Sequence, residues 1–169
     1  MPVGMIDSAP VRDAVTELRG FATGAPLASD HGSTVASLLS ASGITRIHAA
    51  DVYGSDKAGG NALAIAKALG WLTVSGSKIV TISLVGPRNA VLQRAIAASQ
   101  AKGVVIVAAV GNDGPAAPPA FPASYDGVVA VTAVDGKRRA LIEAGKALHL
   151  DYAAPGADIF GLNAKGKRM

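Results

Sequence analysis

The sequence predicts an α/β protein built on a doubly wound parallel sheet flanked by helices. Short apolar runs alternate with segments of helical periodicity roughly 10–15 residues long, which is the spacing of βαβ units. Half of the 169 residues are hydrophobic and only 4% are aromatic, so Ala, Val, Ile and Leu must form the core. The 20 glycines suit tight junctions between strands and helices. This length, without an internal repeat or a long linker, predicts a single domain over residues 1–169.

Periodicity and helix-stop residues define the elements of the first half of the chain. Val11, Val15 and Leu18 fall on one face of a helix, and Gly43 stands at the usual C-terminal stop of another. In order, the predicted elements are a strand at 3–7, helices at 10–19 and 31–42, a strand at 44–52 and a helix at 61–72.

The second half is richer in strands. The run at 103–110 is continuously apolar, which is typical of a parallel strand covered on both faces. Val91, Leu92 and Ile96 suggest the buried stripe of a helix. The predicted elements are a strand at 78–85, a helix at 89–102, strands at 103–110 and 128–134, and short strands at 148–153 and 157–160.

The composition excludes several classes of function. The chain has no cysteine, which excludes disulfides, thiol catalysis and cysteine metal sites. The net charge of +4 is small, and the basic clusters at 137–139 and 165–168 contain no aromatic residues that could stack on bases. We therefore expect no nucleic-acid partner. No apolar run reaches the roughly 20 residues of a membrane-spanning helix, so we expect no membrane partner either.

Three polar residues stand where the functional groups of a parallel sheet gather, beyond the carboxyl ends of the strands. Asp7 ends the first apolar run, His31 opens a helix, and Asn112 follows the run at 103–110. Each has an ordinary alternative role, as a strand-end cap, a first-turn residue and part of a turn, respectively. Their order in one chain favours a catalytic set over three separate structural roles.

The chemistry of these residue types fits acid–base catalysis. An aspartate that accepts from one ring nitrogen of His31 would fix the tautomer and leave the other nitrogen as a general base. The positive end of the helix dipole disfavours protonation, so we expect a free base. The Asn112 amide would donate to the oxygen of a tetrahedral intermediate. Gly32 is expected to leave room for substrate, and Ser33 points to a different helix face from His31, which excludes it as the nucleophile.

Taken in order, these motifs resemble those of the subtilase family of serine proteases over nearly the whole chain. Asp7-Ser8 resembles the Asp-Ser/Thr-Gly motif, and His31-Gly32 resembles His-Gly-Thr. The other matching segments are 83–86 with the Ser-Leu-Gly strand, 109–114 with Ala-Ala-Gly-Asn-Glu-Gly, 121–123 with Tyr-Pro-Ala, and 154–156 with Ala-Pro-Gly.

The resemblance implies a serine endopeptidase that hydrolyses peptide bonds through an Asp-His-Ser triad. Asp7 would orient His31, His31 would act as the general base, and Asn112 would form part of the oxyanion hole. The residues implied for the substrate groove are Ser83, Leu84, Val85, Gly86, Ala109, Val110 and Gly111.

The Gly-Thr-Ser segment that carries the nucleophile in the family does not occur among residues 1–169. We therefore expect a catalytic domain truncated before that serine, inactive by itself and completed by residues outside the chain. Without the serine-bearing helix an apolar groove should face water, which favours self-association. The alternative hypothesis is a catalytically inactive, protease-like module that binds extended peptides along residues 83–85.

Departures from the family pattern and the remaining implications are few. Ala9 stands in place of a glycine and Ser33 in place of a threonine, while Val85 replaces a glycine and is expected to narrow the first specificity pocket.

The resemblance requires no cofactor and allows calcium at surface loops, but the scattered aspartates lack EF-hand spacing and locate no site. It implies a polypeptide substrate, with a pro-segment or the missing C-terminal segment as a further partner. It also implies secretion or a cell-envelope location, although Met1 leads into a strand with no signal-peptide pattern.

Overall fold

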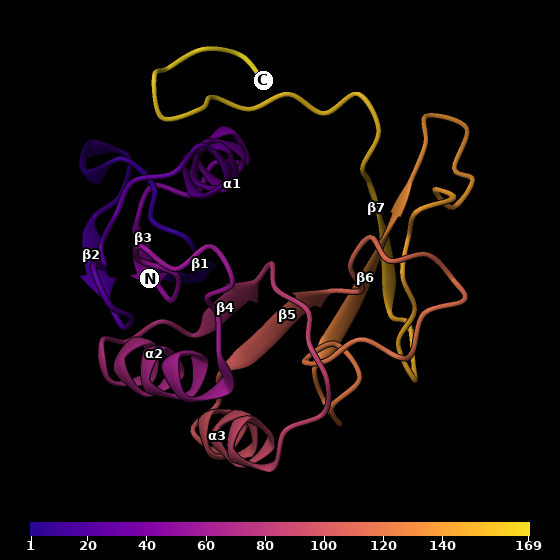
Figure 1. The fold of residues 1–169 in the computed structure, drawn as a ribbon, viewed down its shortest axis with the longest axis horizontal. Helices are drawn as coiled ribbons and strands as arrows, with labels where there is room; N and C mark the ends of the chain where they lie inside the picture. Colours follow the sequence, from indigo (N-terminus) through magenta and orange to yellow (C-terminus); the bar gives the residue numbers. More distant parts are fainter.

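A parallel sheet of seven strands organises the computed structural model, which describes all of residues 1–169 (Figure 1). The strand order is β2-β3-β1-β4-β5-β6-β7, and every neighbouring pair is parallel. The chain builds the sheet outward from β1 in both directions, so the predicted doubly wound sheet is confirmed. The strands are β1 (Val3–Asp7), β2 (Glu17–Gly20), β3 (Ile47–Asp51), β4 (Ile79–Ile82), β5 (Val105–Ala109), β6 (Val129–Val134) and β7 (Tyr152–Pro155).

Helices cover the two faces of the sheet unequally. The helix α1 (Asp30–Ala41) lies on one face, and α2 (Ala62–Val74) and α3 (Ala90–Ala101) lie side by side on the other (Figure 1). None of them is both long and apolar enough to span a bilayer. Each helix begins with a side chain that accepts from its first amides, in order Ser29, Asn61 and Asn89.

Two cores of unequal size hold these layers together. The larger core contains 21 buried residues between the sheet and the pair α2 and α3, among them Ile6, Leu72 and Ile106. The smaller core holds α1 against the sheet through 4 buried residues, which are Met5, Ala36, Ile47 and Ala49. The sheet is therefore anchored mainly on the α2 and α3 side.

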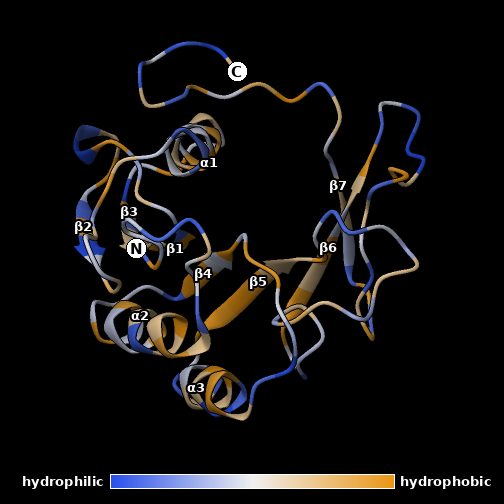
Figure 2. Ribbon diagram, in the orientation of Figure 1, coloured by the Kyte–Doolittle hydropathy of each residue, from blue (hydrophilic) through white to orange (hydrophobic).

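Strands β4 to β6 are covered on one face only, and β7 is exposed along its length. Every residue of β1 and β3 is buried, whereas exposure alternates along β4 and β5 and all of β7 is exposed. Figure 2 shows β4 to β6 as largely hydrophobic strands. We call the uncovered side, which includes Thr81, Val107, Val131 and Ala133, the open face. The groove expected to face water is present on this side of the sheet.

The C-terminal residues 156–169, here called the strap, run from β7 back to α1 (Figure 1). The amide of Leu162 donates to Ser37 Oγ at 2.8 Å, and the amide of Ala164 donates to Asp30 Oδ1 at 3.0 Å. A bridge between Leu162 and Arg168 folds the strap back on itself. The strap therefore joins the far edge of the sheet to the first turns of α1.

Two of the predicted elements are wrong. Residues 10–19 form a 3-10 turn (Arg12–Ala14) and the strand β2 instead of a helix. Main-chain pairing of β2 with β3 overrides the helical spacing, while Val15 and Leu18 still pack on the smaller core. Residues 157–160 form no strand, because the chain leaves the sheet once Gly156 has donated to the carbonyl of Val134. The last strand is β7, which overlaps only the end of the range 148–153.

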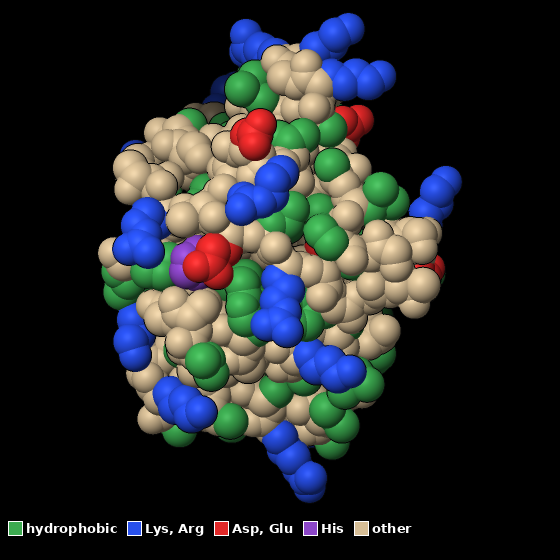
Figure 3. All heavy atoms as spheres, turned by 90° about the vertical axis from the view of Figure 1, so that its left-hand side faces the viewer, with side chains coloured by type: hydrophobic (Ala, Val, Ile, Leu, Met, Phe, Trp, Pro, Cys, Tyr) green, Lys and Arg blue, Asp and Glu red, His purple; other side chains and the backbone are tan.

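The side of the molecule at the left of Figure 1, where β2 lies, faces the viewer in Figure 3. Lys and Arg side chains are spread over this face, with acidic side chains among them, and do not gather in one patch. The expectation of no nucleic-acid partner stays a prediction.

Candidate active site

Asp7 and His31 form a hydrogen-bonded pair at the carboxyl edge of the sheet. Asp7 is the last residue of β1, the strand from which the sheet is built in both directions, and ligands of such sheets bind at that point. His31 Nδ1 lies 2.7 Å from Asp7 Oδ1. The Asp7 side chain is 1% exposed and that of His31 is 64% exposed. The ring is therefore held at one nitrogen, while Nε2 makes no hydrogen bond within the chain.

Hydrogen bonds from neighbouring residues fix the Asp7 carboxylate. Its Oδ1 accepts from the Ser8 amide at 2.7 Å and from the Ser8 hydroxyl at 3.0 Å. The Ser8 hydroxyl also lies 2.7 Å from that of Ser29, which caps α1. A continuous set of hydrogen bonds thus joins the start of the helix to the acid, whereas Asp7 Oδ2 is buried without a partner.

The pKa of His31 is raised above its usual 6.5. The largest cause is the hydrogen bond to Asp7, which favours the imidazolium; partial burial acts in the opposite direction, and the charge of Asp7 raises the pKa further. The expected effect of the helix N-terminus, which disfavours protonation, is opposite in direction to this net shift, because the adjacent carboxylate favours the imidazolium.

The two residues after His31 have structural reasons for their identity. A Cβ on Gly32 would lie 2.1 Å from the carbonyl oxygen of Ser8, so this glycine lets α1 pack on the main chain at 8–9. The expectation that Gly32 also leaves room for substrate stays a prediction. Ser33 is buried; its hydroxyl donates to the Ser29 carbonyl at 2.6 Å and accepts from the Val11 amide at 3.2 Å. These bonds agree with its exclusion as a nucleophile.

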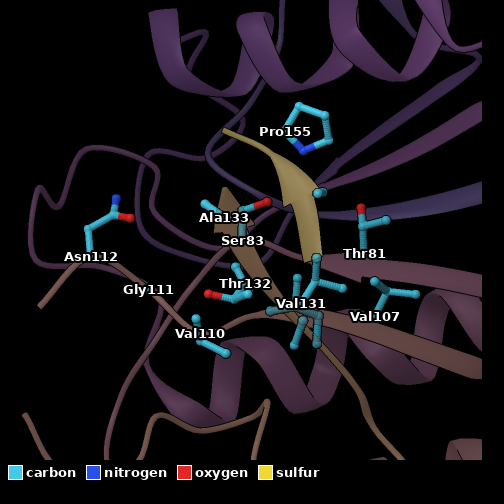
Figure 4. A pocket seen from close by; sticks show the side chains of 14 residues that line it. Thr81, Ser83, Val107, Val110, Gly111, Asn112, Val131, Thr132, Ala133 and Pro155 are labelled. Atoms are coloured by element: carbon cyan, nitrogen blue, oxygen red, sulfur yellow. The ribbon is translucent and has the colours of Figure 1, made fainter. Parts of the chain in front are cut away.

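Asn112 lies at the rim of a pocket on the open face, at the opposite side from Thr81 and Val107 (Figure 4). This residue follows Gly111, whose φ of 79° turns the chain after β5. Its side-chain amide makes no hydrogen bond within the chain, and none links it to the pair of Asp7 and His31. The pocket has a volume of about 290 Å³ and includes four residues predicted for the groove, which are Ser83, Ala109, Val110 and Gly111.

The other predicted groove residues lie beside two neighbouring pockets. Leu84, Val85 and Gly86 line a pocket of about 360 Å³ between residues 58–62 and 84–87. Val85 and Gly86 also line a third pocket, of about 240 Å³, that reaches Val110. A Cβ on Gly111 would lie 2.8 Å from a methyl carbon of Val85, so this side chain packs directly against the main chain after β5. The narrowing of the first specificity pocket by Val85 stays a prediction.

Two residues close to the end of β1 were not predicted from the sequence. The pKa of Tyr53 is raised, first by burial and second by the charge of Asp7. Asp51 ends β3 directly beside Asp7 in the sheet register, and its position at the end of an apolar run was the signal that could have identified it.

No group of three or more His, Cys, Asp or Glu side chains is placed to hold a metal ion. Calcium at a surface loop therefore stays a prediction without a located site.

Replacing Asp7 with Asn should lower the pKa of His31 toward its ordinary value, because the amide carries no negative charge. In the unmodified chain, protonated His31 stabilises the fold below pH 6.5, and this contribution is lost as the pH rises through the raised pKa. The variant should lose that pH dependence. NMR titration of His31, with urea unfolding at several pH values, measures both effects. A His31 titration unchanged by the substitution would contradict the pairing.

Comparison with known proteins identifies one family. The model of the subtilase family matches residues 16–167. Subtilisin DY of Bacillus licheniformis is 30% identical over 180 residues, covering 94% of this chain and 65% of that protein. Subtilisin BL of Lederbergia lenta is 31% identical over 153 residues, covering 82% of this chain and 56% of that protein. The chain therefore spans between about half and two thirds of the length of these relatives.

Solved structures share the fold. A lanthipeptide protease matches with a TM-score of 0.85 at 19% identity, covering 99% of this chain and 62% of its own. A cold-adapted subtilisin-like serine proteinase matches with a TM-score of 0.82 at 19% identity, covering 99% of this chain and 67% of its own. At these identities the likeness concerns the fold alone, and both folds extend beyond the part that this chain matches.

Proposed function

This chain belongs to the subtilase family of serine proteases, and we propose that it supplies the acid, the base and part of the oxyanion hole of an endopeptidase. The nucleophilic serine would come from outside residues 1–169. The observation that carries the proposal is the 2.7 Å hydrogen bond between His31 and the buried Asp7 at the carboxyl edge of the sheet.

The pair can move a proton in the direction that acyl transfer needs. Asp7 holds Nδ1, so Nε2 of His31 is left to accept the proton of a serine hydroxyl as it attacks a peptide carbonyl. The imidazolium formed in this step is stabilised by the adjacent carboxylate, the same interaction that raises the pKa of His31. The proton then passes to the leaving amine.

The substrate would be an extended polypeptide. We assign its main chain to the edge formed by residues 83–86 and its scissile carbonyl to the space beside Ala109, Val110 and Gly111, within reach of the Asn112 amide. Among the relatives is the minor extracellular protease Epr of Bacillus subtilis, 31% identical over 117 residues, which supports secretion of this protein too.

A serine-directed fluorophosphonate tests the proposal. A protein that contains residues 1–169 together with the serine-bearing segment should be labelled at that serine, and His31→Ala should abolish the labelling. His149→Ala removes an imidazole at the far edge of the sheet and should leave it intact. Labelling that persists in the His31→Ala protein would refute the assigned base.

Replacing Asn112 with Ala should lower kcat by about 10²–10³ in the serine-containing protein, with little change in KM; the magnitude is that of subtilisin, not of this chain. The effect falls on kcat because the amide contacts an oxyanion that exists only along the reaction path. Steady-state kinetics on a peptide substrate measures it, with Gln93→Ala on α3 as a matched loss of a carboxamide. An unchanged kcat would remove Asn112 from the site.

A peptide-binding module without catalysis is the second candidate, because the groove residues at 83–86 and 109–111 are all present while no Gly-Thr-Ser is. In this case the full gene product would bind extended peptides, with NMR shift changes at these two segments, and would not react with the fluorophosphonate.

A further inference from the structure

A second buried aspartate stands next to the candidate acid. Asp51 ends β3, pairs in register with Asp7 of β1, and is 0% exposed. Its carboxylate accepts three main-chain hydrogen bonds and forms no ion pair with Lys, Arg or His. Oδ2 accepts from the Leu27 amide at 2.9 Å, and Oδ1 accepts from Tyr53 at 2.9 Å and Gly54 at 3.0 Å.

These three donors belong to two different loops. Leu27 lies in residues 21–29, which lead from β2 into α1, whereas Tyr53 and Gly54 lie in residues 52–61, which lead from β3 into α2. The loops also touch directly, because the Ser55 amide donates to the Thr23 carbonyl at 3.0 Å. A single carboxylate thus ties both loops to the end of β3.

The first of these loops sets the position of His31. Leu27 is two residues before Ser29, whose amide donates to the Ala9 carbonyl at 2.8 Å and whose hydroxyl accepts from the Gly32 amide at 3.0 Å. The His31 side chain is 64% exposed, so few packing contacts hold the ring. Its place relative to Asp7 depends on where the main chain enters α1.

The chemistry of the site requires a carboxylate. Two acceptor oxygens are both used, and each faces only N–H donors. A carboxamide has one acceptor oxygen and one NH₂ group, so an Asn at this position would set a donor against a main-chain donor on one side. An unpaired buried amide is costly, and the loop on that side would move away.

We propose that Asp51 is a positioning residue, which holds the entry of α1 through the Leu27 amide and so keeps His31 in hydrogen-bond contact with Asp7. This role rests on the proposed function of the pair. Nothing in it requires Asp51 to touch the substrate or the reacting atoms. Asp51 therefore acts on the base through the main chain.

NMR on the 169-residue chain tests this role with Asp51→Asn. We expect amide exchange at Leu27 to accelerate about tenfold or more, because a hydrogen bond to a charged group is lost. We also expect the pKa of His31 to fall toward its ordinary value although Asp7 is intact. Asp151→Asn is the matched control, because Asp151 also accepts a main-chain bond, from Ala130, but next to β6 and away from the pair. Asp151→Asn should change neither the amide exchange rate at Leu27 nor the pKa of His31.

A pair of variants at Leu27 covers the case in which Asp51→Asn does not fold. Leu27→Pro removes the main-chain N–H that donates to Asp51 and keeps the Asp51 carboxylate. Leu27→Ala removes the leucine side chain but keeps that N–H. The pKa of His31 should fall in the first and not in the second. A His31 titration unaffected by Asp51→Asn, or equal in the two Leu27 variants, would overturn the proposal. An ordinary pKa in the unmodified chain would instead overturn the function proposed for Asp7 and His31.

Discussion

Purified residues 1–169 should hydrolyse no peptide bond above background. In subtilisin, removal of the serine alone lowers kcat by about 10⁶, a magnitude taken from that protein and not from this one. Neither Ser8, Ser29 nor Ser33 can substitute, because each hydroxyl is engaged in the hydrogen bonds that hold Asp7 and α1. Incubation of the chain with an unstructured protein, followed by mass spectrometry, measures the residual rate.

The control for this experiment is the His31→Ala variant purified in the same way. Traces of a contaminating protease would give equal cleavage in both preparations. Cleavage that survives repurification and disappears only in the variant would show that the chain holds its own nucleophile, and the proposal of a serine outside residues 1–169 would then fail.

A second prediction with a large expected effect concerns the stability of the chain and the exposed apolar residues of the open face. Exposed apolar surface costs roughly 25 cal/mol per Å², so an uncovered area of several hundred Å² forgoes several kcal/mol of stabilisation. That is comparable to the net stability of a typical domain. The chain should therefore bind a hydrophobic dye and self-associate, and its unfolding midpoint should be low. Size-exclusion chromatography, dye titration and urea unfolding measure these properties.

Two adjacent residues of β5 make this test specific. Val107 lies on the open face, and Ile106 is 0% exposed on the side of α2 and α3. Val107→Thr should weaken dye binding with little loss of stability, whereas Ile106→Thr should destabilise the fold by about 2 kcal/mol or more. A monodisperse, dye-free monomer with cooperative unfolding would show that the chain closes its own core, and the expectation of an incomplete fold would be wrong.

Much of the site could be predicted because its residues are set by sequence-local signals. Asp7 ends an apolar run and His31 opens a helix, so their meeting follows from the rule that parallel strands end at one edge. Asp51 carries the same signal at the end of β3, but its role depends on which amides two loops bring to it. Loop placement of this kind results from tertiary packing, which periodicity does not describe.

The errors have the same origin. The 10–19 segment has helical spacing, yet its strand forms because an edge of the sheet is available for pairing at β3. The pKa of His31 moves opposite to the expectation from the helix terminus because a buried carboxylate lies 2.7 Å away. In both cases a partner distant in sequence decides the outcome. The local pattern alone predicts the wrong type of element at 10–19 and the wrong direction for the pKa shift of His31.

The difference in size between the two cores predicts that α1 opens more easily than the rest of the fold. The helix α1 rests on a core of 4 buried residues, whereas the opposite face is held by 21. Segments with few buried contacts open at lower free energy than the global unfolding of a domain, so α1 should detach and return while the central strands stay paired. Asp7 lies on a fully buried central strand and should exchange slowly, whereas His31 should belong to the layer that opens first. The lifetime of the acid–base pair would then depend on how often α1 detaches.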